Sequence, residues 1–172
     1  SYLRNGKCSM VSYMRSIPTH TCLILCLWLS AVAYGQTAIN VLGAGFRGTL
    51  HDNVSNEKRQ GSGFNPLILK SHPKTNLFRD DAVGFNFEHI FNGAQAQHAI
   101  SMFTPRQDPC QVRDVGKNRY QLHWPSKGSQ WGMEAQMIYD LSEADHVDVE
   151  FKCTPTEVAI YSKGFAAMMW AS

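Results

Sequence analysis

The sequence predicts an all-β protein built as an antiparallel β-sandwich. After residue 80, apolar and polar side chains alternate with a period of two in several short runs, which is the pattern of strands that bury one face. Turn-forming residues separate these runs, and the prolines stand at their ends. No sustained helical period follows residue 36. Together these observations favour a sandwich of short strands over a fold with packed helices.

The clearest pair of predicted strands covers residues 131–140 and 146–153. The apolar members of the two alternating patterns are Trp131, Met133, Ala135, Met137, Tyr139, Val147, Val149, Phe151 and Cys153. Because the turn-forming stretch 142–145 separates the runs, we expect an antiparallel hairpin with one buried and one wet face. Glu134, Asp148 and Glu150 then lie on the wet face.

Further strands are predicted at 85–91, 98–103, 111–115, 119–124 and 164–170. The last of these is apolar on both faces, and a strand buried on both sides needs more sheet to cover it. We therefore expect a sandwich that is incomplete at the C-terminal end of this sequence.

The N-terminal part predicts an exported protein. Residues 14–35 combine a basic start, an apolar run of about a dozen residues and a small-residue cleavage pattern, which is typical of a secretory signal peptide. The run is shorter than the ~20 residues of a membrane helix, although an uncleaved anchor is the alternative. Residues 1–13 are interpreted as a non-native upstream segment. The expected location is secreted or periplasmic, with no membrane span after cleavage.

Two regions are expected after the signal peptide: a weakly structured segment, 36–74, and a partial β-sandwich domain, 75–172. The first contains the polar stretch 51–63 and little periodicity. Removing residues 1–35 leaves 13 basic against 14 acidic residues, a net charge of −1 instead of the +2 of the whole chain. With no basic run left, nucleic acid is not an expected partner.

Two cysteines, Cys110 and Cys153, remain after the signal peptide. In an oxidising compartment they are candidates for one disulfide, and two buried free thiols are the alternative. The pair alone cannot form a zinc motif, so no metal and no cofactor are predicted.

A glycine pattern at 43–48, Gly-Ala-Gly-Phe-Arg-Gly, matches the dinucleotide-binding fingerprint. The fingerprint works only when a helix follows and its amides approach a pyrophosphate. The residues that follow show no amphipathic period, so the pattern favours a glycine-rich segment, with a nucleotide-dependent oxidoreductase as a minor alternative.

His123, Trp124 and Trp131 surround a predicted loop between two strands. Aromatic faces beside polar groups are how many proteins hold sugars, because the C–H face of a pyranose packs on a ring. The alternative is that both tryptophans belong to the core, since large aromatic residues are mostly buried.

A second polar group consists of Arg79, Asp80 and Asp81 with Glu88 and His89. A histidine and a carboxylate brought together can exchange protons with a substrate. Simple ion pairing at a sheet edge is the competing interpretation.

From about residue 65 onward the chain resembles the galactose-mutarotase-like supersandwich group, which includes secreted bacterial proteins of mostly unassigned function. The resemblance covers only the N-terminal part of that fold. The resemblance rests on the runs Asn86 to Gly93, His123-Trp124-Pro125, Trp131 to Glu134 and Phe165 to Ser172. It implies a large two-sheet sandwich whose concave face holds carbohydrate, with aldose 1-epimerases, polysaccharide lyases and binding modules as relatives. The epimerase Asn-x-x-His-Gly-Gly stretch is missing here, and no catalytic role is assigned to a residue.

The resulting hypothesis is an exported carbohydrate-binding or carbohydrate-active β-sandwich protein. If it is an enzyme, acid–base chemistry at an anomeric carbon is the expected reaction. The alternative is a secreted structural or protein-interaction module without catalysis. The residues expected to face a sugar are Arg79, His89, His123, Trp124 and Trp131.

Overall fold

The computed structural model describes residues 38–53, 61–93 and 103–171, and these form antiparallel β-sheets. Within these ranges the regular elements are nine strands and short 3-10 helices such as η2 (Thr104–Arg106) and η3 (Val158–Tyr161). The predicted all-β class is confirmed. The predicted signal peptide and upstream segment lie outside the described residues, as does the strand expected at 98–103, apart from Phe103 at a turn. In the described ranges no helix has the length and apolarity to cross a membrane.

The first sheet occupies the segment that was expected to be weakly structured. β1 (Ala38–Leu42), β2 (Phe46–His51) and β3 (Gly63–Leu69) pair antiparallel in that order. Their inward residues Ile39, Val41, Phe46, Leu50, Phe64 and Leu67 are buried. The expectation for 36–74 was therefore wrong. These strands are only five to seven residues long and are interrupted by glycine and proline, which hid their alternation.

The glycine pattern at 43–48 forms the turn between β1 and β2 and then enters β2, so no helix follows it. The Ala44 amide donates to the Leu141 carbonyl at 2.8 Å, and the Gly45 amide donates to the Glu143 carbonyl at 3.3 Å. A Cβ at Gly45 would overlap the Ala144 carbonyl. Glycine is needed here for close backbone approach, and the structure contradicts the nucleotide-site interpretation.

The largest sheet has four strands in chain order: β5 (Gln111–Gly116), β6 (Arg119–Trp124), β7 (Met133–Asp140) and β8 (Asp148–Pro155). The predicted hairpin is confirmed as β7 and β8, with Met137 opposite Phe151 and Tyr139 opposite Val149. The apolar face of β7 is buried, whereas β8 is an edge strand, and Val149 keeps 41% of its surface exposed.

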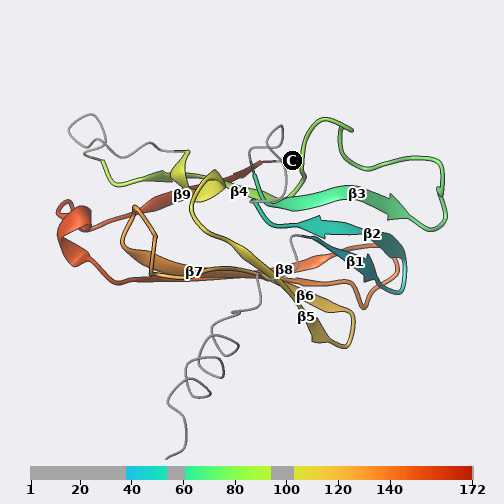
Figure 1. Cartoon of the computed structure of the whole chain (residues 1–172). Coiled ribbons are helices and arrows are strands. Elements are labelled where there is room, and N and C mark those ends of the chain that lie inside the picture. Colours follow the sequence, from blue (N-terminus) through green and yellow to red (C-terminus); the bar gives the residue numbers. More distant parts are fainter. Residues whose placement is uncertain (1–37, 54–60, 94–102, 172) are drawn as a thin grey trace, which may run out of the picture. The chain divides into compact units, whose positions relative to one another are not determined.

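A two-stranded sheet, β4 (Asn86–Phe91) with β9 (Ala167–Ala171), packs against the four-stranded sheet (Figure 1). The Phe87 ring on β4 contacts Trp124 of β6 at 5.5 Å between centroids and Phe151 of β8 at 5.0 Å. Trp170 of β9 contacts Phe151 at 4.9 Å. The two inner faces thus meet through aromatic side chains, as expected for sheets that share a core.

One core joins all three sheets, and the described residues belong to one compact unit. The Tyr139 ring lies 4.7 Å from the Phe64 ring of β3, and its hydroxyl donates to the Phe85 carbonyl at 2.8 Å. The Tyr120 hydroxyl accepts from the Leu42 amide at 2.9 Å and donates to the Leu42 carbonyl at 3.1 Å. The strands before residue 74 therefore pack into the same core as the strands after it.

Candidate polar site on the four-stranded sheet

The face of the four-stranded sheet that points away from the core is covered by polar side chains. Successive side chains of a strand point to opposite faces, so the residues between the buried positions of β6 and β7 share this outer face. We call it the wet face; it carries Gln111, Arg113, Arg119, Gln121, His123, Glu134, Gln136, Ile138, Asp140, Asp148, Glu150, Lys152 and Thr154.

On the wet face, the side chains of His123 on β6 and Glu134 on β7 contact each other. The His123 Nε2 atom lies 3.1 Å from the Glu134 Oε1 atom. The His123 side chain is 19% exposed and that of Glu134 is 53% exposed. His123 Nδ1 is buried and has no hydrogen-bond partner among the described residues. A buried ring nitrogen without a partner is unusual, because buried polar groups are nearly always satisfied.

A groove of about 160 Å³ runs beside this pair across β7 and β8. Its lining consists of Glu134, Ala135, Gln136, Lys152 and Thr154. The Gln121 Nε2 atom donates to Gln136 Oε1 at 3.0 Å, which leaves the Gln136 NH₂ group directed to other acceptors. Amide, ammonium, hydroxyl and carboxylate groups therefore converge on one short stretch of the sheet.

This arrangement supplies both donors and acceptors of hydrogen bonds. The carboxylate of Glu134 accepts, the ammonium of Lys152 donates, and the hydroxyl of Thr154 does both. A histidine in contact with a carboxylate can also pass a proton to or from a bound group. The groove thus presents both hydrogen-bond donors and acceptors, and a histidine–carboxylate contact lies next to it.

Trp124 and Trp131 lie on the other side of this sheet, in the core, where they are 3% and 1% exposed. The Trp124 indole donates from Nε1 to the Pro105 carbonyl at 3.0 Å. Both rings line a cavity of only about 10 Å³, which has room for about one water molecule. The structure therefore places them as core residues, the alternative given above, and no sugar ring can stack on them in this conformation.

Arg79 lies apart from the histidines, on an exposed turn. Its guanidinium contacts the Asp81 carboxylate at 2.7 Å, and both side chains are mostly exposed, at 80% and 67%. An exposed pair of this kind contributes little to stability. For Arg79 the structure thus shows the simple ion pairing that was given above as the alternative to a functional site.

His89 belongs to a separate cluster, which a β-bulge creates. Phe87 pairs with Trp170 and His89 pairs with Met169, so Glu88 is an extra residue on β4. The bulge turns Glu88 and His89 to the same face, where His89 Nδ1 lies 3.5 Å from Glu88 Oε2 and Arg106 Nη1 lies 3.0 Å from Glu88 Oε1.

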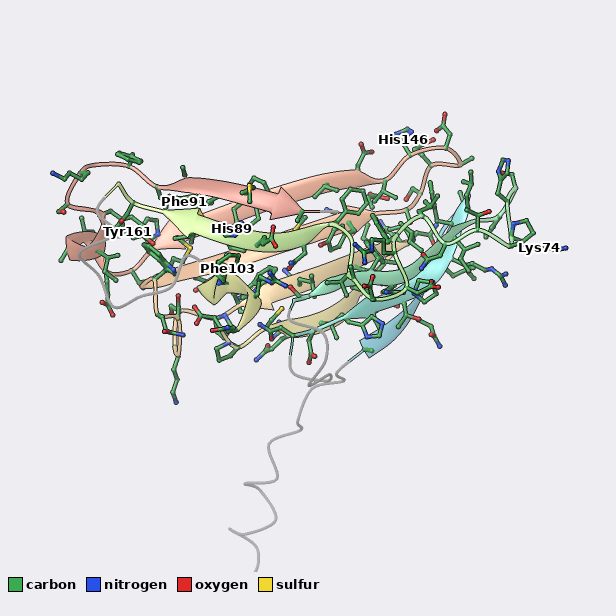
Figure 2. All side chains as sticks on the ribbon, turned by 90° about the horizontal axis from the view of Figure 1, so that it is seen from above. Lys74, His89, Phe91, Phe103, His146 and Tyr161 are labelled. Carbon is green, nitrogen blue, oxygen red and sulfur yellow. The ribbon has the colours of Figure 1, made fainter. Side chains whose placement is uncertain are left out.

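Aromatic rings enclose His89 on this outer face. The Phe91 and Phe103 ring centroids lie 5.8 Å and 4.3 Å from the imidazole centroid (Figure 2), and His89 is only 7% exposed. The predicted Glu88–His89 proximity is thus present.

Cys110 and Cys153 are both free thiols. Cys110 is in the core, where burial raises the pKa of its thiol far above the usual range. The Cys153 sulfur lies 3.8 Å from the Met168 sulfur, and partial burial also raises its pKa. The structure corresponds to the free-thiol alternative and contains no disulfide between them.

Sequence reasoning missed several members of this site: Gln121, Gln136, Lys152 and Thr154. Their strands were predicted, and Glu134 was assigned to the wet face, but the pairing of residues 119–124 with 133–140 was not. That pairing places His123 opposite Gln136 and diagonal to Glu134. In the described ranges, no group of three or more histidine, cysteine or acidic side chains has the geometry of a metal site.

Comparisons of the chain with protein-family models, curated proteins and solved structures find no match.

Proposed function

We propose that this chain is an exported carbohydrate-binding protein whose sugar site is the groove of the wet face beside His123 and Glu134. The observation that carries the proposal is the groove across β7 and β8, lined by Glu134, Gln136, Lys152 and Thr154. The signal-peptide pattern of residues 14–35 supports export.

Sugar recognition fits the chemistry of the groove. Each sugar hydroxyl donates one hydrogen bond and accepts others, so a site that holds sugar through its hydroxyls needs both kinds of partner. The groove supplies acceptors from Glu134 and donors from Gln136 and Lys152. With both tryptophans in the core, binding on this face relies on hydrogen bonds more than on stacking, and we expect millimolar rather than micromolar affinity.

The proposal extends to catalysis through the contact between His123 and Glu134. An imidazole held by a carboxylate can take a proton from, or return it to, a sugar hydroxyl. Reaction at an anomeric carbon needs such an acid–base pair. If the protein is an enzyme, His123 is the residue that we expect to exchange the proton, with Glu134 in contact with it at 3.1 Å.

The test is a titration of the protein with monosaccharides and oligosaccharides, followed by NMR shifts of backbone amides in β6, β7 and β8. We expect saturable shifts confined to this sheet. The variant His123→Ala should lose most of the binding, and Glu134→Gln should weaken it. His72→Ala is the matched control, because His72 is exposed on the turn after β3 and should bind like the wild type.

Absence of saturable shifts with every sugar would refute the proposal. Equal loss of binding in His123→Ala and His72→Ala would also count against the site, because the effect would then not be local. Catalysis is assayed separately, by the rate at which pure α-anomers of the bound sugars mutarotate with and without protein.

A second candidate function is a secreted protein-interaction module. The observation that favours it is a set of exposed apolar side chains on or near β8 and β9: Val149, Phe165, Met169 and Trp170, each at least 41% exposed. Exposed apolar side chains can contribute to protein contact surfaces.

Tryptophan fluorescence separates the two functions. Trp170 should be quenched by iodide, whereas Trp124 and Trp131 should not. If the protein is an interaction module, self-association or partner binding will protect Trp170 from iodide, and no sugar will shift the amides of β7. If sugar binds on the wet face, the sugar will leave iodide quenching of Trp170 unchanged.

A further inference from the structure

The basic residues of the wet face differ in their partners. Arg119 contacts Asp140 at 3.5 Å and Glu150 at 3.8 Å, and His123 contacts Glu134 at 3.1 Å. Arg113 donates to the Gln111 side chain. Within the described part of the chain, Lys152 is the basic residue of this face that has neither an ion pair nor a hydrogen bond from its side chain.

The carboxylates near Lys152 are already engaged. Glu150 precedes it by two residues on β8 and contacts Arg119, and Glu134 contacts His123 on the other side of β7. Neither reaches the Lys152 ammonium within the 4.0 Å of an ion pair. The positive charge of Lys152 is therefore not neutralised locally by the residues that surround it.

A second donor stands directly opposite Lys152. Gln136 and Lys152 are register partners on β7 and β8, and the Cβ atoms of such partners lie about 5 Å apart. Gln136 lines the groove, and because its Oε1 atom accepts from Gln121, its NH₂ group is left to donate to a ligand there. Gln121 thus acts as a positioning residue that fixes which end of the amide a ligand meets.

The groove consequently has two chemically different ends. The Glu134 end accepts hydrogen bonds, and the Gln136–Lys152 end only donates them and carries the positive charge. We infer that the groove prefers a sugar with an anionic substituent, a uronic acid, whose carboxylate contacts Lys152 and Gln136 while its hydroxyls contact Glu134. This inference rests on the proposed function and specifies its ligand class.

The test compares D-glucuronate and D-galacturonate with glucose and galactose by NMR titration at low ionic strength. Because Lys152 is exposed, we expect only about threefold to fivefold tighter binding of the acidic sugars. The difference should shrink at high salt, because ions screen an exposed charge. The neutral uronamides should bind like the parent sugars.

Lys152→Met should remove the preference for acidic sugars. Because Lys152 also donates to neutral sugars in the proposed site, their affinity should fall as well, so the preference is measured as the ratio of the acidic to the neutral affinity. Lys74→Met is the matched control, since Lys74 is exposed on the turn after β3, and it should keep the preference. Gln121→Leu should weaken the preference through Gln136 without touching the ligand itself. Circular dichroism verifies that each variant is folded.

The outcomes are distinguishable. Equal binding of acidic and neutral sugars, or a preference that survives in Lys152→Met, overturns this inference and leaves the proposed function intact. Acetate alone giving the same shifts as uronates also overturns it, because the groove would then bind anions without a sugar. Failure of every sugar to bind the wild type refutes the proposed function and this inference with it.

Discussion

Replacing Gly45 with alanine tests how the turn between β1 and β2 is held against the four-stranded sheet. A Cβ at this position would overlap the carbonyl and Cα atoms of Ala144. These are backbone atoms, so the turn or the loop after β7 must move. The movement would disturb three backbone hydrogen bonds: Ala44 to Leu141, Gly45 to Glu143 and Lys70 to Gly45.

The expected loss of stability follows from these contacts. Overpacking of a close contact costs about 1–3 kcal/mol, and each weakened hydrogen bond costs about 0.5–1.5 kcal/mol. We expect the free energy of unfolding to fall by about 3 kcal/mol. For a unit of this size, one kcal/mol corresponds to roughly 3–4 °C in Tm, so Tm should fall by about 10 °C.

Thermal and urea unfolding, followed by circular dichroism, measure this change. Gly116→Ala is the control, because a Cβ there meets nothing within 4 Å and only the backbone angle φ of 83° opposes it. That strain costs about 1 kcal/mol. If Gly45→Ala destabilises the protein no more than Gly116→Ala does, the close packing of this turn is not what requires glycine.

Two further predictions concern buried groups. Under native conditions at pH 8, a thiol reagent should modify the half-buried Cys153 before the buried Cys110. Peptide mapping by mass spectrometry identifies the modified cysteine. Equal labelling of both would contradict the core position of Cys110. Burial raises the pKa of Asp108, although the Gln130 amide and side chain donate to its carboxylate. Because the pKa of Asp108 is higher in the folded than in the unfolded protein, ionising this carboxyl lowers the free energy of unfolding. The loss is absent below the unfolded pKa and develops as pH rises through the folded pKa. The stability of Asp108→Asn relative to wild type should therefore increase between pH 3 and pH 7 in urea titrations, and a constant difference would show that Asp108 has no shifted pKa.

The alternation of side chains predicted the strands of the four-stranded sheet well. The run from Met133 to Tyr139 has a buried apolar member at every second position, and the hairpin with residues 148–155 follows from the turn between them. The same reasoning failed for residues 38–69. There the strands are short, and glycine and Pro66 dilute the pattern, so the segment resembles a loop in sequence.

The candidate site was predicted only in part. His123 was singled out for its neighbouring tryptophans, yet Trp124 faces the core and His123 faces solvent because adjacent residues of a strand point in opposite directions. Its actual neighbour, Glu134, lies 11 residues away in sequence and meets it through strand pairing. Glu88 and His89 were grouped correctly, although the bulge that turns both to one face leaves no trace in the alternation.

By itself the sequence determined the all-β class, the β7–β8 hairpin and the polar character of its outer face, because these depend on alternation and turn residues that are local in the chain. The tertiary structure decided that residues 38–69 join the same core, that both tryptophans are buried, and that His123 meets Glu134 beside Gln136 and Lys152. These features depend on which strands pair and in which register. Register arises from packing between segments far apart in sequence, and a local pattern does not contain it.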